Sequence, residues 1–230
     1  MQMLKAIVFD LDDTLYPERQ YALSGFAAVA DWAEASLGIP SEQGYAELEA
    51  YFDGGVRGYT FNRWIEAHDL EPDQWLPEMV KCYRDHSPSL EPYPETHSVL
   101  RSLRGSYRLG LITQGHRPGQ QRKLEALKLT DYFEAVLILG EQDRQDWKPS
   151  QVPFERLLEE LDLAASQAAY IGDNPLKDFV GARQLGMLTI WVRRQEGEHA
   201  EDVPPGPEYQ ADIELPDLTV LENALEAELQ

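Results

Sequence analysis

Short apolar runs alternate with longer amphipathic segments over most of the chain, and this alternation predicts a parallel sheet flanked by helices. The first run, Ala6–Phe9, is continuously apolar, which is typical of a strand buried on both faces. Strands are expected at residues 4–10, 109–112, 135–139, 168–171, 188–192 and 211–215. Helices are expected between them at 95–103, 119–127, 152–161 and 177–185, with a short helix at the C-terminus.

The stretch between residues 17 and 90 has helical periodicity and no convincing strand. Helices are expected there at 21–37, 41–52, 59–68 and 73–86, and a Pro-rich segment follows. We therefore predict an α/β fold in which residues 1–15 and 91–230 form a doubly wound, Rossmann-like parallel sheet core. Residues 16–90 are expected to form an all-helical domain inserted after the first strand.

The net charge of the chain is −21, from 41 acidic and 20 basic residues. Such a charge disfavours binding to nucleic acid or to anionic membranes, and it is compatible with a cation in the site. Residues 101–128 reverse this balance with seven Lys or Arg and a single acid, Glu125. This basic zone is either a site for an anionic substrate or a solvated helix face.

The single cysteine, Cys82, excludes an intramolecular disulfide and fits a reducing compartment. The N-terminus has no apolar signal region, and no run of about 18 apolar residues occurs. We therefore expect a cytoplasmic protein without a membrane segment.

Polar residues follow four of the expected strands. They are Asp10, Asp12, Asp13 and Thr14 after the first, Thr113 and Gln114 after the second, Lys148 in a loop after the third, and Asp173, Asn174 and Asp178 after the fourth. The carboxyl ends of parallel strands share one edge of the sheet, where α/β proteins bind ligands. Each residue alone is also common in turns and helix caps. Their ordered coincidence favours a shared site.

Several carboxylates and one ammonium group around a cleft suit a hard cation with oxygen ligands, and Mg²⁺ fits best. The sequence lacks a Cys/His cluster for zinc, a P-loop, a dinucleotide-binding glycine motif and a Gly-x-Ser-x-Gly nucleophile motif. A carboxylate nucleophile working with a metal ion remains, and carboxylates do form aspartyl-phosphate intermediates.

Four motifs in order carry a resemblance to a known family. They are Asp10-Leu11-Asp12-Asp13-Thr14, Thr113, Lys148-Pro149 and Gly172-Asp173-Asn174-Pro175-Leu176-Lys177-Asp178. With them the chain resembles the haloacid dehalogenase-like (HAD) hydrolases, in the phosphatase branch with a helical cap inserted after the first strand. The resemblance implies a hydrolase of phosphate monoesters whose cap, residues 16–90, closes over the cleft.

The resemblance also implies a role for each motif residue. Asp10 is expected to attack phosphorus, and Asp12 to act as general acid and then base, which requires a raised pKa. The resemblance further assigns phosphate binding to Thr113, charge compensation to Lys148, Mg²⁺ binding to Asp10, the Asp12 carbonyl and Asp173, and support to Asp178 and Asn174. Further candidate substrate contacts are Gln114, Gly115, Tyr16 and Arg57.

The alternatives concern reaction and substrate. Haloacid dehalogenases lack the second aspartate, so Asp12 argues against that reaction, whereas a sugar phosphomutase keeps both carboxylates. A non-catalytic binding protein is disfavoured because the motif residues are intact. The expected partner is a small phosphorylated metabolite, namely a nucleotide, a sugar phosphate or an organic phosphate monoester. The protein is expected to be a monomer or a homodimer.

Overall fold

The computed structural model describes residues 3–228, and the chain forms two compact units. Unit 1 comprises Met1–Glu18 and Glu91–Gln230, and unit 2 comprises Arg19–Leu90. Tyr16 and Glu18, which the sequence assigned to the inserted domain, therefore belong to unit 1.

Unit 1 is built on a six-stranded sheet in the order β3-β2-β1-β4-β5-β6, with every neighbouring pair parallel. The strands are β1 (Ala6–Phe9), β2 (Arg108–Gln114), β3 (Ala135–Leu139), β4 (Ala168–Gly172), β5 (Leu188–Val192) and β6 (Ile213–Leu215). This order confirms the doubly wound α/β prediction. The strand order reverses between β1 and β4, and ligands of such sheets bind in the crevice at the carboxyl ends of the strands at that point.

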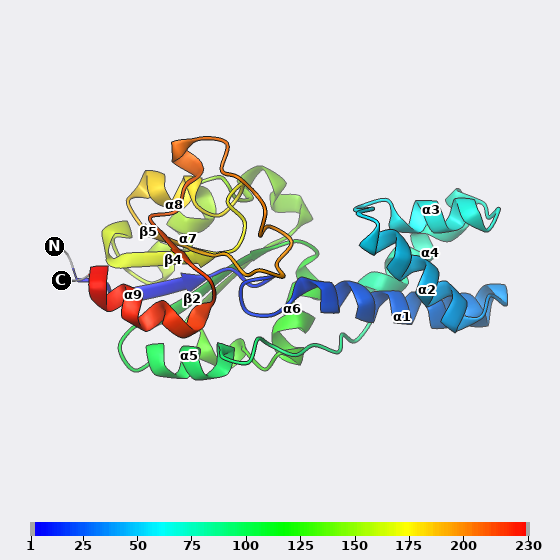
Figure 1. Ribbon diagram of the computed structural model, residues 1–230, viewed down its shortest axis with the longest axis horizontal. Coiled ribbons are helices and arrows are strands. Elements are labelled where there is room, and N and C mark those ends of the chain that lie inside the picture. Colours follow the sequence, from blue (N-terminus) through cyan, green and yellow to red (C-terminus); the bar gives the residue numbers. More distant parts are fainter. Residues whose placement is uncertain (1–2, 229–230) are drawn as a thin grey trace. The chain divides into compact units, whose positions relative to one another are not determined.

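Helices cover both faces of this sheet. They are α5 (Thr96–Leu103), α6 (Arg117–Ala126), α7 (Val152–Glu160), α8 (Val180–Leu185) and α9 (Leu221–Glu228). Figure 1 shows α7 and α8 on one side of the strands and α5 and α9 on the other. Because β1 lies between β2 and β4 and its four residues are fully buried, the chain leaves the sheet at its centre.

Among the boundaries in unit 1 that differ from the prediction, two lie at the site. β2 continues to Gln114, so Thr113 and Gln114 are the last strand residues and pair with Ile138 and Leu139 of β3. The helix expected from residue 177 begins only at Val180. Before it, the backbone turns around Asn174, whose side-chain oxygen accepts the Leu176 N–H.

Unit 2 is helical throughout, as the sequence predicts. Its helices are α1 (Glu18–Leu37), which begins at the end of unit 1, α2 (Ser41–Asp53), α3 (Thr60–Ala67) and α4 (Pro72–Asp85). Its core contains the fully buried side chains of Leu48, Trp64 and Met79, one from each of α2, α3 and α4. Among residues 3–228, no helix has both the length and the apolar character needed to cross a membrane.

Candidate active site

The centre of the candidate site is a buried lysine between carboxylates. Asp10 follows β1 directly, and Lys148 comes from the loop before α7; both are more than 90% buried. The Lys148 Nζ atom donates to Asp10 Oδ1 at 2.6 Å, to Asp178 Oδ1 at 2.6 Å and to the Tyr170 hydroxyl at 2.7 Å. Burial lowers the pKa of Lys148, but Asp10 and Asp178 raise it well above its usual value. Lys148 is therefore a fixed positive charge.

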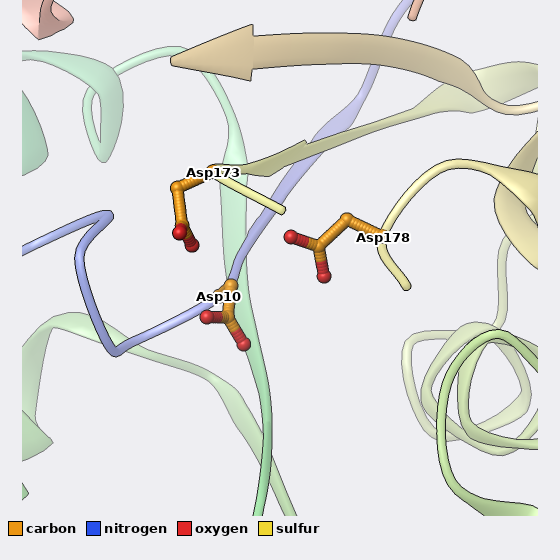
Figure 2. Close-up of side chains that lie close together, drawn as sticks. All are labelled: Asp10, Asp173 and Asp178. Atoms are coloured by element: carbon orange, nitrogen blue, oxygen red, sulfur yellow. The ribbon is translucent and has the colours of Figure 1, made fainter. Parts of the chain in front are cut away.

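Three carboxylates, from Asp10, Asp173 and Asp178, offer oxygens within 4.8 Å of one another. Figure 2 shows Asp10, from the end of β1, beside Asp173 and Asp178, which both come from the loop between β4 and α8. Burial raises the pKa of Asp10 to about 7 against the opposing effect of Lys148. Burial, together with Asp178 and Asp10, also raises the pKa of Asp173 well above its usual value. Three carboxylates this close together repel one another when they are ionised, and a divalent cation would offset that repulsion. Oxygen ligands of this kind fit a hard cation such as Mg²⁺.

Asp12 has a separate set of partners. Its Oδ1 accepts hydrogen bonds from the Tyr16 hydroxyl at 2.5 Å and from Lys123 Nζ at 2.7 Å, and its Oδ2 accepts one from Gln120 Nε2 at 3.0 Å. Burial alone would raise the pKa of Asp12, but the charge of Lys123 and these hydrogen bonds outweigh it and lower the pKa. The expectation of a raised pKa for Asp12 is therefore wrong for this state of the protein, because it did not include Lys123.

The end of β2 forms the next wall of the site. Thr113 is buried, and its hydroxyl accepts a hydrogen bond from Gln120 Nε2. The Gln114 side-chain oxygen accepts the backbone N–H of Lys148 at 3.0 Å, which ties the lysine loop to this strand. Gly115 has a φ of 144°, a conformation that favours glycine.

One cavity of about 180 Å³ within unit 1 brings these residues together. Its walls include, of the predicted residues, Asp10, Asp12, Thr113, Gln114, Gly115, Lys148, Asp173, Asn174 and Asp178. The Tyr16 side chain is fully buried and its hydroxyl donates to Asp12, so it supports Asp12; its substrate contact stays a prediction. Arg57 lies in unit 2, where its guanidinium stacks 3.7 Å from the centroid of the Phe52 ring. Its substrate contact stays a prediction.

Several residues at the site were not identified from the sequence. Glu18, Trp147, Lys177 and His199 also line the cavity, and Gln120, Lys123 and Tyr170 hold its carboxylates or its lysine. Gln120 and Lys123 lie three residues apart in the basic zone and so share a helix face, but the sequence does not show that this face packs against Asp12.

Asp13 has a structural role that the sequence left unassigned. Its Oδ1 accepts the N–H of Glu18, the first residue of α1, at 2.8 Å. An acceptor at this position satisfies one of the unpaired donors at a helix N-terminus. The carboxylate thus stabilises the start of α1.

Comparison with known proteins agrees with this geometry. The chain is 31% identical to a glyceraldehyde 3-phosphate phosphatase of Methanopyrus kandleri, over 88% of this chain and 91% of that protein. It is 29% identical to a phosphoserine phosphatase of Thermus thermophilus, over 94% and 96% of the two chains. A crystal structure of a HAD phosphatase from Thermococcus onnurineus superposes with a TM-score of 0.61 at 28% identity, covering 96% of this chain and 98% of that one. Residues 7–192 match the family model for haloacid dehalogenase-like hydrolases. The chain therefore belongs to the haloacid dehalogenase-like hydrolase family.

Proposed function

We propose that this protein is a Mg²⁺-dependent phosphatase that hydrolyses a small phosphate monoester through an aspartyl-phosphate intermediate. The observation that carries the proposal is the arrangement of Asp10, whose Oδ1 is held by the buried ammonium of Lys148, in one cavity with Asp12 and Thr113. A nucleophile, an acid–base group and a phosphate-binding hydroxyl thus face one space.

The first step is attack of an Asp10 carboxylate oxygen on phosphorus. A bond forms between Asp10 and phosphorus, the bond from phosphorus to the ester oxygen breaks, and Asp12 gives a proton to the departing oxygen. This step requires Asp12 to be protonated in the substrate complex, although Lys123 lowers its pKa in the protein without substrate. Lys148 stabilises the negative charge on Asp10 and on the phosphoryl group, and Thr113 donates to a phosphate oxygen. Pre-positioned charges of this kind are the main contribution that proteins make to phosphoryl transfer.

The second step hydrolyses the intermediate. Water attacks phosphorus, Asp12 takes the water proton, and the Asp10–phosphorus bond breaks to release phosphate and the free carboxylate. Asp12 is thereby returned to its protonated form for the next turnover. The two steps need one carboxylate to form and break a bond to phosphorus and another to exchange protons. This division agrees with the separate partners of Asp10 and Asp12, which are Lys148 and Lys123.

Asp10, Asp173 and the backbone carbonyl of Asp12 are the groups that would hold Mg²⁺. When bound, the ion would supply positive charge that offsets the negative charge of the phosphoryl group. The Thr14 hydroxyl donates to Asp173 Oδ1 at 3.2 Å and therefore orients that carboxylate. Asp178 is engaged with Lys148 and with the backbone N–H of Asn174, so its role is to support the lysine.

The names of two relatives favour a small substrate. Two relatives carry the names of phosphatases for glyceraldehyde 3-phosphate and phosphoserine, both three-carbon compounds. We therefore place three-carbon phosphate monoesters ahead of nucleotides.

The test is release of inorganic phosphate from glyceraldehyde 3-phosphate, phosphoserine, a hexose 1-phosphate and a nucleoside 5'-monophosphate. Activity that requires Mg²⁺, is abolished by EDTA and is lost in Asp10→Asn supports the proposal. The variant Lys128→Met, with an exposed lysine in unit 1, is the control for substitution as such. Conversion of the hexose 1-phosphate to its 6-phosphate without phosphate release would instead indicate a mutase. Equal activity of Asp10→Asn and the unmodified protein would refute the nucleophile.

A further inference from the structure

A second buried lysine, Lys123, stands on α6 outside the four motifs. Its side chain is 5% exposed, although lysine is almost never buried without a partner. The Nζ atom lies 2.7 Å from Asp12 Oδ1 and 3.9 Å from a carboxylate oxygen of Glu18. A buried ammonium with this partner carries a desolvation cost that its contact with Asp12 must offset.

Gln120 lies one helical turn before Lys123 on the same face of α6 and is equally buried. Its Nε2 contacts Asp12 Oδ2 and the Thr113 hydroxyl, so one amide group joins the acid–base carboxylate to the phosphate-binding residue. Both carboxylate oxygens of Asp12 are therefore fixed from α6, Oδ1 by Lys123 and Oδ2 by Gln120.

We propose that Lys123 and Gln120 are positioning residues that hold the Asp12 carboxylate in the orientation that proton transfer at the cavity requires. The inference rests on the proposed phosphatase function and adds to it the two side chains that act through Asp12. Gln120 holds Oδ2, and Lys123 holds Oδ1 together with the Tyr16 hydroxyl, so the carboxylate plane is fixed about its side-chain torsion. Without Lys123, Oδ1 keeps only the neutral Tyr16 donor, which holds it less strongly than a charged one. A misplacement of about 1 Å in such a group can reduce the rate by about 10²-fold.

The kinetic consequence depends on the leaving group. The leaving group of 4-nitrophenyl phosphate, 4-nitrophenolate, departs without taking up a proton. The first step with this substrate therefore does not need Asp12 as an acid. Its second step, hydrolysis of the aspartyl-phosphate, still needs Asp12 as base. A fault in Asp12 positioning should therefore slow only the second step for this substrate, and the intermediate should accumulate.

The experiment is pre-steady-state hydrolysis of 4-nitrophenyl phosphate by Lys123→Met with Mg²⁺. We expect a burst of nitrophenol approaching one per site, then a steady-state kcat lowered about 10²-fold. KM should fall by the same factor, so that kcat/KM is unchanged. With an alkyl phosphate, which needs Asp12 in both steps, kcat/KM should fall as well. Lys123→Arg should restore part of kcat, and Lys128→Met, an exposed lysine two residues past the end of α6, should behave as the unmodified protein.

A double-mutant cycle separates action through Asp12 from a general effect on the fold. In the background of Asp12→Asn, the change Lys123→Met should cause no further loss in kcat. The variant Gln120→Met removes a donor without removing a charge and should give a burst with about a tenfold loss in kcat. It also keeps the inference testable if Lys123→Met does not fold.

The outcomes distinguish this inference from the proposed function. If the unmodified protein releases no phosphate, the phosphatase proposal fails and takes this inference with it. If the unmodified protein is active, the inference is overturned when Lys123→Met keeps the kcat of the unmodified protein. It is also overturned when Lys123→Met lowers kcat/KM for 4-nitrophenyl phosphate and shows no burst. A third contrary outcome is that Lys123→Met lowers kcat further in the Asp12→Asn background.

Discussion

Removing the Lys148 ammonium should destabilise unit 1 more than any other single side-chain change at the site. The lysine makes two charge-assisted hydrogen bonds of 2.6 Å, to Asp10 and Asp178, and a third of 2.7 Å to the Tyr170 hydroxyl. The substitution Lys148→Met keeps most of the apolar stem and deletes the charge. The two carboxylates then stay buried without a cation.

The expected loss follows from these contacts. Hydrogen bonds to charged groups contribute about 1.5–3 kcal/mol each, so the two carboxylate bonds alone correspond to about 3–6 kcal/mol. Breaking a buried ion pair by removing one partner costs about 3–5 kcal/mol, which agrees with this sum. We therefore expect the free energy of unfolding of unit 1 to fall by about 3–5 kcal/mol. The matched control Tyr170→Phe keeps the charge, loses one neutral donor–acceptor group and should cost about 1 kcal/mol.

The assay is urea unfolding at pH 8 with EDTA, in which hydrogen–deuterium exchange of peptides from β1 and β4 monitors the unfolding of unit 1. These strands belong to unit 1, so the signal is independent of the helices of unit 2. Added Mg²⁺ should recover part of the loss, because a bound cation replaces some of the missing positive charge. A loss below 1 kcal/mol, or one equal to that of Tyr170→Phe, would refute the view that Lys148 compensates buried carboxylates.

Three further predictions concern the same unit. A Cβ on Gly172 would lie 2.3 Å from Asp178 Oδ2, so Gly172→Ala should displace that carboxylate and lower kcat by at least tenfold in a phosphate-release assay; an unchanged kcat would contradict the fit. In the metal-free protein, the pKa of Asp10 is raised from 3.8 to about 7, so its protonated form favours folding, and thermal stability in EDTA should fall as pH rises through this range. Mg²⁺ should therefore raise Tm more at pH 8 than at pH 5, and an equal shift at both would disagree with a cation beside Asp10. Asp13→Ala removes the acceptor for the Glu18 N–H and should cost about 1 kcal/mol in thermal unfolding, whereas Asp13→Asn should cost less.

The sheet could be predicted from the sequence because its signals are local. A buried parallel strand is a short apolar run, and the carboxyl end of each run is visible as a change to polar residues. The residues after these runs, from Asp10 to Asp178, were predicted on that basis, and the structure brings all of them except Asp13 and Thr14 to the walls of one cavity. The start of α8 was misplaced because the side chain of Asn174 accepts a backbone N–H there and delays the helix.

The environment of Asp12 could not be predicted in the same way. Seven basic residues lie between positions 101 and 128, and no sequence pattern shows which of them is buried. Only the packing of α6 against the sheet brings Lys123 to Asp12, 111 positions earlier in the chain. Without that pair, burial indicates a raised pKa for Asp12, and with it the sign of the shift reverses.

The distribution of the two lysines identifies where positive charge is still required. Lys148 contacts Asp10, and Lys123 contacts Asp12, so each carboxylate that takes part in bond making or proton transfer has its own ammonium group. Among residues 3–228, no lysine or arginine forms an ion pair with Asp173, whose pKa is raised by burial and by its acidic neighbours. Asp173 is thus the carboxylate whose ionisation depends most on an added cation. Loss of that carboxylate in Asp173→Asn should therefore raise the Mg²⁺ concentration needed for half-maximal activity, whereas Lys123→Met should leave that concentration unchanged. The reverse pattern would assign the cation to the Asp12 side of the cavity.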